Sequence, residues 1–518
     1  MESNALKKPG VALAAITFAG IAGIISYGLL VLGLDAHVPI AVAAIFAGLI
    51  GKFVVGITWT EMSSSISSAI TSSLEALLIL IAIGMLVGSW VQAGVVPGMI
   101  YYGFNLLSPG VFLTATLLIC SVVSLATGSS WGVGGTVGVA LIGIAAGLGI
   151  PAPLTAGIII SGAYFGDKMS PLSDTTNLAP AVAGSNLFDH IRAMAWTTMP
   201  TYVIVIIITV VLGFGYSSGS GSFDPTRIQA FQAILAAEFN INPLYAMVPP
   251  LIVLGLTMAK CPALPGMMAG TFAASALAMI QGFSLGDALE AVHYGYHSTV
   301  ATKLADAGVE GISAVMAETN IMGLAPEMAH ETASLITELL NRGGLDSMMW
   351  SLSLIMIALV LGGIMESCRY LEVLLNPLLF RVRKVGGFVT LVVVSCFACN
   401  LFLGDQYLGI LVPGRMFKTA VDRTTLSPRM LSRTLEDSGT LTAVLIPWTG
   451  CGAFQSAALG VPTLTYAPYA FLNWMNPIVA ILMTYMGIGI YRGKNGADKV
   501  EKGTDIDFRI TEQEALKI

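Results

Sequence analysis

The sequence predicts an all-α protein that crosses a membrane many times and is built from two repeated halves. Of its 518 residues, 55% are hydrophobic and only 10% are charged, whereas soluble domains carry about 25% charged residues. Apolar segments long enough to cross about 30 Å of hydrocarbon are expected near 11–34, 38–56, 74–93, 196–216, 243–259, 261–281, 347–365 and 465–490. We expect about ten transmembrane helices, together with two re-entrant hairpins and broken helices, in a polytopic protein.

A shift of 276 residues aligns special features of the two halves, including Gly128 with Gly404 and Pro171 with Pro447. Each half contains a polar-tipped apolar segment (110–149 and 386–421), interpreted as a re-entrant hairpin or two spans, and then a broken helix (153–185 and 439–463). Each half then crosses the membrane an odd number of times, so the halves should be inverted repeats. The predicted parts are a first repeat (1–216), an external linker (217–242), a second repeat (243–490) with an external insertion (282–346), and a cytoplasmic tail (491–518).

The distribution of basic residues supports this organisation. With the N-terminus inside, 20 of the 24 Lys and Arg residues fall in cytoplasmic segments or the tail, and three fall outside (Arg227, Lys303 and Arg342). Such an asymmetry is typical of the positive-inside rule. We therefore expect both termini on the cytoplasmic side, and the insertion, which carries the amphipathic run EMAHETASLITELL, outside.

The most informative feature is the polar run from Ser161 to Pro180, which interrupts an otherwise apolar, membrane-crossing region. Polar backbone and carboxylates at membrane depth are costly unless they line a site, and such breaks mark transporter binding sites. The candidate ion- and proton-binding residues here are Asp167, Ser170, Ser173, Asp174, Thr175, Thr176 and Asn177. The polar tips add Thr127, Ser129, Ser130 and Asp405.

These residue types suit a small hard cation, which needs several oxygen donors and a carboxylate. A carboxylate that holds either a proton or Na⁺ exchanges the two when the site alternates between sides. Asp167 and Asp174 are the first candidates; Lys168 could neutralise Asp167, which would leave Asp174 as the exchanging group. The alternative interpretations are interfacial carboxylates for Asp167 and Asp174, and helix caps for Ser129, Ser130 and Asp405.

Other function classes find little support. Of the six cysteines, Cys396 and Cys399 form a CxxC without a second pair or a nearby histidine, so small buried apolar residues are the better interpretation. The sequence has no basic nucleic-acid patch, no phosphate loop and no catalytic Ser/His/Asp arrangement. We therefore expect neither an enzyme nor a nucleic-acid partner, and no cofactor.

Three runs resemble the NhaC-type Na⁺/H⁺ antiporter family: GAYFGDKMSPLSDTTNLAPAVAG (162–184), KCPALPG (260–266) and GDQYLGILVPGRMF (404–417). The family lies in a wider set of ion transporters with inverted repeats and two re-entrant hairpins. The resemblance implies exchange of Na⁺ for H⁺ across the cytoplasmic membrane, and a homodimer with a moving transport domain. It also implies Na⁺ ligands at Ser129, Ser130, Asp174, Thr175 and Thr176.

The same family contains a Na⁺–lactate/malate–H⁺ antiporter with a very similar motif, so an organic-acid carrier is the alternative. A small organic anion would require a fixed cation at membrane depth. Lys168 and Arg415 are the candidates for that cation, although Arg415 also suits a positive-inside anchor.

Overall fold

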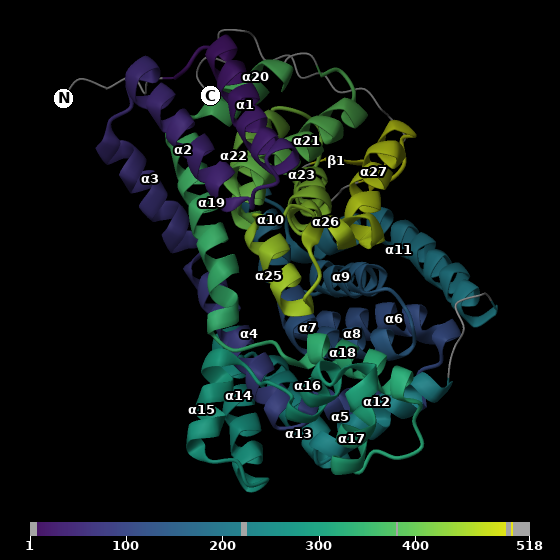
Figure 1. Cartoon of the computed structure of the whole chain (residues 1–518). Helices are drawn as coiled ribbons and strands as arrows, with labels where there is room; N and C mark the ends of the chain where they lie inside the picture. Colours follow the sequence, from purple (N-terminus) through teal and green to yellow (C-terminus); the bar gives the residue numbers. More distant parts are fainter. Residues whose placement is uncertain (1–7, 219–224, 380–381, 494–498, 501–518) are drawn as a thin grey trace.

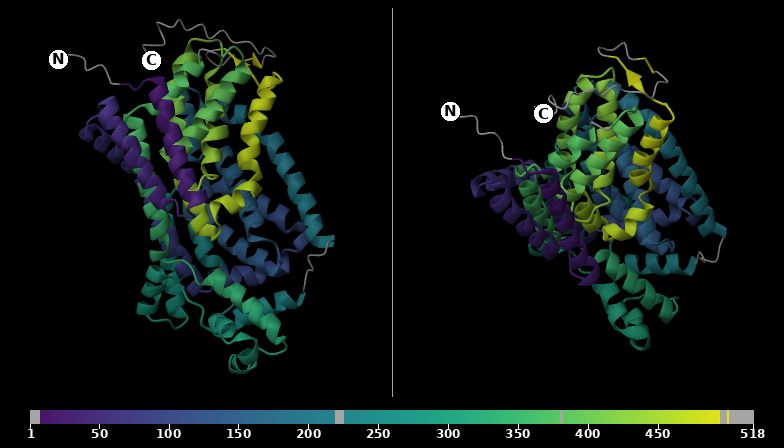
Figure 2. Two further views of the ribbon diagram at one scale, coloured as in Figure 1. Left: turned by 45° about the horizontal axis from the view of Figure 1, so that its top comes forward. Right: turned by 90° about the horizontal axis from the view of Figure 1, so that it is seen from above.

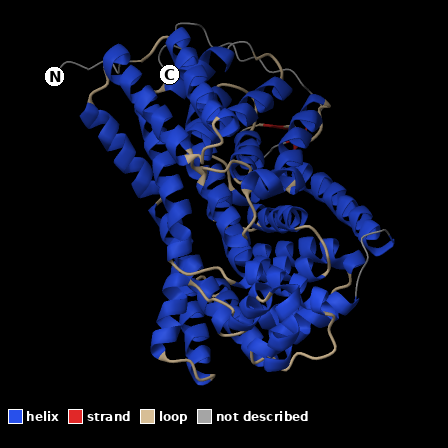
Figure 3. Cartoon of the chain, in the orientation of Figure 1, coloured by secondary structure: helices blue, strands red, loops and turns tan. Residues whose placement is uncertain are grey.

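The computed structural model describes residues 8–218, 225–379, 382–493 and 499–500. The described chain is almost entirely helical (Figures 1 and 3), and it includes nine helices long and apolar enough to cross a membrane, or ten if the bent α12–α13 pair is one span. The prediction of an all-α polytopic membrane protein is confirmed. Except for 491–493 and 499–500, the predicted tail lies outside the described residues.

Five helices follow from the start of the described chain, and the first three of them lie together at the upper left in Figure 1. The five are α1 (Val11–Ser26) with its π-helical extension η1 (Tyr27–Val31), α2 (His37–Ile50) with η2 (Gly51–Val55), α3 (Trp59–Ser72), α4 (Leu74–Gln92) and α5 (Val95–Leu106). Large apolar side chains such as Leu30, Ile45 and Phe53 are exposed on these helices. Contiguous exposed apolar surface is unusual on soluble monomers and suits contact with lipid.

The first polar tip and break follow. The elements are α6 (Pro109–Thr127), α7 (Ser130–Val133), η3 (Gly134–Gly138), α8 (Val139–Gly147), α9 (Ala152–Met169), α10 (Asp174–Ala183) and the long α11 (Leu187–Ser218). The broken helix expected over 153–185 is the α9–α10 pair.

The middle of the chain gives α12 (Pro225–Glu238), α13 (Pro243–Met258), α14 (Ala263–Ile280), α15 (Leu285–Tyr294), α16 (Thr299–Asp306), α17 (Gly308–Glu318), α18 (Pro326–Leu340) and η4 (Asp346–Met348). The run expected to be helical in the insertion is α18. The helices α15 and α17 lie at the lower end in Figure 1, opposite the start of α1 and α20; the same ends are apparent in Figure 2 (left).

The second half contains α19 (Met349–Ser367), α20 (Tyr370–Leu379), α21 (Val385–Leu403), α22 (Gln406–Asp422), α23 (Pro428–Leu435), η5 (Glu436–Thr440), α24 (Leu441–Ala443), α25 (Gly450–Leu459), α26 (Thr463–Tyr466), η6 (Ala467–Tyr469) and α27 (Phe471–Tyr485). The short strands β1 (Tyr491–Arg492) and β2 (Lys499–Val500) pair antiparallel. The span expected over 465–490 is wrong in detail, because α26 and η6 interrupt it and α27 has only 15 residues.

Element boundaries recur at the 276-residue spacing. The helices α6 and α21 match in both bounds, as do α10 and α25. The glycines that end α6 and α21, Gly128 and Gly404, have φ of 69° and 70°, a left-handed conformation that glycine adopts without strain. The second break begins after Ala443, because residues 428–443 form one helical run with η5 in its middle.

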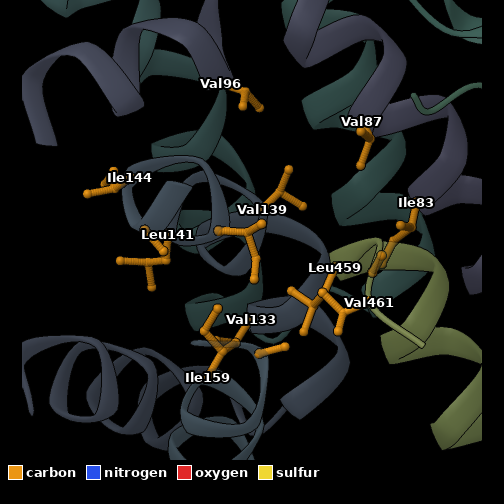
Figure 4. Close-up of a cluster of buried hydrophobic side chains, with 14 of the residues drawn as sticks. Ile83, Val87, Val96, Val133, Val139, Leu141, Ile144, Ile159, Leu459 and Val461 are labelled. Atoms are coloured by element: carbon orange, nitrogen blue, oxygen red, sulfur yellow. The ribbon is translucent and has the colours of Figure 1, made fainter. Parts of the chain in front are cut away.

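Packing joins the two halves. One apolar cluster places Val133, Val139 and Ile159 from the first half against Leu459 and Val461 from the second (Figure 4). All are buried. Interiors are close-packed, so this cluster fixes α8 and α9 relative to α25 and holds the polar tips in place.

Candidate functional site

Each polar tip packs on the break of its own half. A Cβ at Gly128 would lie 2.7 Å from the backbone carbon of Leu172, so only glycine permits this approach to the first break. At the equivalent place in the second half, the amide of Gly450 donates to the carbonyl of Gly404 at 3.2 Å. The tip residues cap the helices that follow, because Ser129 Oγ accepts from the Gly132 amide and Asp405 Oδ1 from the Leu408 amide.

The two halves also contact each other at these points. From the second tip, the Tyr407 hydroxyl donates to Asp174 Oδ2 in the first break. From the second broken helix, Gln455 Nε2 donates to the carbonyl of Ser130 in the first tip at 3.2 Å. Two tips and two breaks therefore meet in one region.

A cavity of about 640 Å³ opens at this meeting point. Six of the predicted site residues line it: Thr127, Ser129, Ser130, Asp167, Asp174 and Asp405. It is also lined by Glu75 from α4, by Gln406 and Tyr407, and by Lys260 from the turn between α13 and α14. Sequence analysis assigned Lys260 to a cytoplasmic loop and missed its place in the site; the adjoining KCPALPG run was the available signal.

Asp167 and Asp174 differ in environment. Asp167 is only 5% exposed; its Oδ2 accepts from the amide and hydroxyl of Ser130 at 3.1 and 2.6 Å, and its Oδ1 has no hydrogen-bond partner among the described residues. Asp174 is exposed and accepts from Tyr407 and from the Thr175 amide. An incompletely satisfied buried carboxylate is costly, and Asp167, unlike the exposed Asp174, has that environment.

The other predicted residues of the first break do not line the cavity. Their polar groups instead satisfy the backbone that the break exposes: Ser170 Oγ donates to the Leu125 carbonyl, Ser173 Oγ accepts from the Thr176 amide, Thr176 Oγ1 donates to the Lys168 carbonyl, and Asn177 Nδ2 donates to the Ser173 carbonyl. Thr175 Oγ1 donates to Glu436 at 3.1 Å, so it connects the break to a charged group that sequence analysis missed.

The predicted neutralisation of Asp167 by Lys168 is wrong. Lys168 Nζ lies 2.6 Å from Asp437 Oδ1, and both side chains are fully buried. Asp437 also accepts from Thr197 and Asn476. Successive residues on α9 point in different directions, so the two neighbours reach different partners. The sequence signal that was missed is the adjacent Glu436–Asp437 pair, which lies in a buried helical run.

The two fixed cations considered for an organic anion do not line the cavity. Lys168 is paired with Asp437, and Arg415 is exposed on α22. At the second tip, Asp405 accepts from Ser73 Oγ at 2.6 Å as well as capping α22. Cys396 and Cys399 are buried in the second apolar cluster, as expected for small apolar residues.

Comparison with known proteins identifies the family. The sequence profile of the Na⁺/H⁺ antiporter family matches residues 162–325 and 294–488. The chain is 35% identical to the Na⁺/H⁺ antiporter NhaC of Alkalihalophilus pseudofirmus, covering 95% of this chain and 99% of that protein. It is 35% identical to the arginine/ornithine antiporter ArcD of Halobacterium salinarum (96% of each chain) and 34% identical to the malate-2H⁺/Na⁺-lactate antiporter of Bacillus subtilis (81% and 82%). The chain therefore belongs to the Na⁺/H⁺ antiporter family.

Proposed function

We propose that the chain exchanges Na⁺ for H⁺ across the cytoplasmic membrane by alternating access, with these ions as its substrates and no cofactor. The observation that carries the proposal is Asp167, a buried carboxylate on the cavity wall with one unpartnered oxygen. A proton and Na⁺ compete for such a carboxylate, because each neutralises the same negative charge. The names of the NhaC relatives agree with this substrate pair.

In this proposal the cavity admits the ion, and the tips and breaks supply oxygen. The Ser129 and Ser130 region, Asp174 and Asp405 line the route, while Thr175 and Thr176 stabilise the first break. Asp167 couples the ions, and Asp174 acts at the cavity wall, where Tyr407 holds it. The sequence favoured Asp174 as the exchanging carboxylate, whereas this proposal assigns that role to Asp167.

We place the transport cycle in two inverted repeats, 1–216 and 243–490, with both termini cytoplasmic. The recurrence of α6 with α21 and of α10 with α25 supports this plan, since transporters commonly alternate by moving one repeat-built part against another. A homodimer, with a fixed scaffold and a moving transport domain, is part of the same proposal.

The test is Na⁺-driven proton movement in liposomes that contain the purified protein and an internal pH-sensitive dye. Asp167→Asn should abolish the signal, and Asp174→Asn should reduce it and weaken the apparent Na⁺ affinity. Asp346→Asn, which changes an exposed residue of η4, should leave the signal unchanged. A normal signal from folded Asp167→Asn protein would remove Asp167 from the coupling role.

A second candidate is an organic- or amino-acid carrier coupled to Na⁺ and H⁺. A cavity of about 640 Å³ falls in the range of small-molecule sites, and Lys260 and Glu75 line it with opposite charges. Two relatives are named for organic substrates. Adding lactate, malate or arginine to the same liposomes distinguishes the functions: acceleration that Lys260→Gln removes would favour this carrier.

A further inference from the structure

A layer of buried charged residues lies behind the cavity. It consists of Asp167, Lys168, Arg433, Glu436 and Asp437, each at most 5% exposed. Three carboxylates face two cations, which leaves one excess negative charge when all five are ionised. An uncompensated charge in such an interior is strongly unfavourable, so the layer requires one more positive charge.

Both oxygens of the Asp437 carboxylate have ion-pair or hydrogen-bond partners. It is paired with Lys168 at 2.6 Å, and Arg433 Nε lies 3.8 Å from its second oxygen. Thr197 and Asn476 donate to the same carboxylate. The excess charge therefore resides on the other two carboxylates, Asp167 and Glu436.

Glu436 and Asp167 each have one unsatisfied oxygen. Glu436 Oε1 accepts from Thr175 Oγ1, but Glu436 Oε2 and Asp167 Oδ1 are buried without a hydrogen-bond partner among the described residues. The two carboxylates interact electrostatically. The hydroxyls of Thr175 and Ser173 lie 3.2 Å apart, and Ser173 neighbours Asp167.

The backbone at Glu436 is also unusual. Glu436 begins η5, a π-helical turn within the α23–α24 helical run. Single π-turns disturb the regular hydrogen bonding of a helix and often occur at functional sites. Glu436 and Asp437, adjacent in sequence within this turn, have different partners.

We infer that Glu436, Asp167 and Thr175 form a buried Na⁺-binding site behind the cavity. Carboxylate and hydroxyl oxygens suit a hard cation, and one monovalent ion balances the excess charge where a divalent ion would exceed it. Asp167 lines the cavity as well, so the inferred site adjoins the cavity through this residue. The inference rests on the proposed function and adds a ligand, Glu436, from the second half.

The surrounding charged and titratable groups do not supply that balance. Lys168 is paired with Asp437 and also lies near Glu436, and Arg433 is engaged with Asp437, so both cations are already counted in the balance. His190 contacts Ser432 and is a neighbour of Lys168. Cys396 of α21 and Asp174 of α10 also face the layer, and neither adds positive charge.

The test measures ²²Na⁺ binding to the purified full-length protein by scintillation proximity, together with exchange in liposomes. Loss of a charged ligand is worth about tenfold or more in affinity. We expect Glu436→Gln to raise the ²²Na⁺ dissociation constant at least about tenfold, and the isosteric Thr175→Val to raise it by about threefold to tenfold. Glu366→Gln, on α19 outside the layer, is the matched control and should bind as wild type does.

A second readout separates ligation from structural support. Glu436→Gln removes the excess charge, so in Na⁺-free buffer it should unfold at a temperature no lower than wild type, and added Na⁺ should no longer stabilise it. If Glu436→Gln fails to fold, the ²²Na⁺ affinities of Thr175→Val and Glu436→Asp test the inference in its place. If the folded variants bind ²²Na⁺ with wild-type affinity and the wild-type protein exchanges Na⁺ for H⁺, the inference is overturned and the proposed function is retained. If the wild-type protein shows no Na⁺-driven proton movement, the proposed function is refuted instead.

Discussion

The charge balance of the buried layer predicts that replacing Lys168 lowers the free energy of unfolding more than replacing its partner Asp437 does. Lys168→Met keeps most of the length of the side chain but removes its charge. Three carboxylates then face Arg433 alone, with two negative charges in excess. Asp437→Asn leaves two carboxylates with two cations and no excess. The double variant returns the layer to the wild-type excess of one.

The magnitudes follow from the geometry. Both members of the pair are fully buried at 2.6 Å, and removing one partner of such a pair costs about 3–5 kcal/mol. We expect Lys168→Met in that range. Asp437→Asn should cost only about 1–3 kcal/mol, because an amide keeps acceptor contact with Thr197 and because Lys168 also interacts with Glu436. The double variant should recover most of the loss.

Thermal unfolding of the detergent-purified variants, followed by tryptophan fluorescence, tests the order. With an unfolding entropy of about 2 cal/mol/K per residue over 518 residues, a loss of about 4 kcal/mol lowers the midpoint by about 4 °C. The expected order is Lys168→Met lowest, then Asp437→Asn, then the double variant. A double variant less stable than Lys168→Met, or a Lys168→Met midpoint equal to wild type, would refute the charge balance.

Three further predictions concern transport and topology. Tyr407→Phe removes the hydroxyl that donates to Asp174. The Na⁺ concentration for half-maximal exchange should rise about fivefold, equivalent to about 1 kcal/mol. An unchanged Na⁺ dependence would show that this hydrogen bond does not contribute to exchange. Arg415→Gln, exposed and outside the cavity, should transport normally with Na⁺ alone or with an organic anion, and selective loss of anion transport would contradict this. In protein without native cysteines, Arg383→Cys should be labelled from the cytoplasm and Arg227→Cys from outside; labelling of both from one side would overturn the inverted-repeat plan.

The helices and the first break could be predicted from sequence because their signals are local. Apolar runs set the spans, and the polar residues between Asp167 and Asn177 mark the break wherever the chain goes next. Glycine at 128 and 404 likewise carries its own conformational requirement. These features need no knowledge of which helices meet.

The partners of the charged residues could not be predicted, since they depend on how the halves dock. Lys168 and Asp437 are 269 residues apart in sequence, and nothing local distinguishes Asp437 from Asp167 as the partner of Lys168. The place of Lys260 was missed for the same reason: a turn between two apolar helices looks like a surface loop until the cavity against it is known. The broken helix of the second half was expected over 439–463, but its first part begins at Pro428, because η5 joins α23 and α24 in one helical run.

The two halves have diverged at the point where their tips meet. The Tyr407 hydroxyl donates to Asp174. At the 276-residue spacing, Tyr407 corresponds to Trp131 and Asp174 corresponds to Gly450. The Trp131 indole would lie 3.7 Å from a Cβ placed on Gly450. Trp131 also stacks on Phe454, with ring centroids 4.1 Å apart. One side of the cavity is thus polar and acidic while its counterpart is aromatic. A second carboxylate at position 450 would add another negative charge beside a layer that already carries one in excess. With glycine at that position, the Na⁺ site that we propose has one excess negative charge, which one monovalent cation balances.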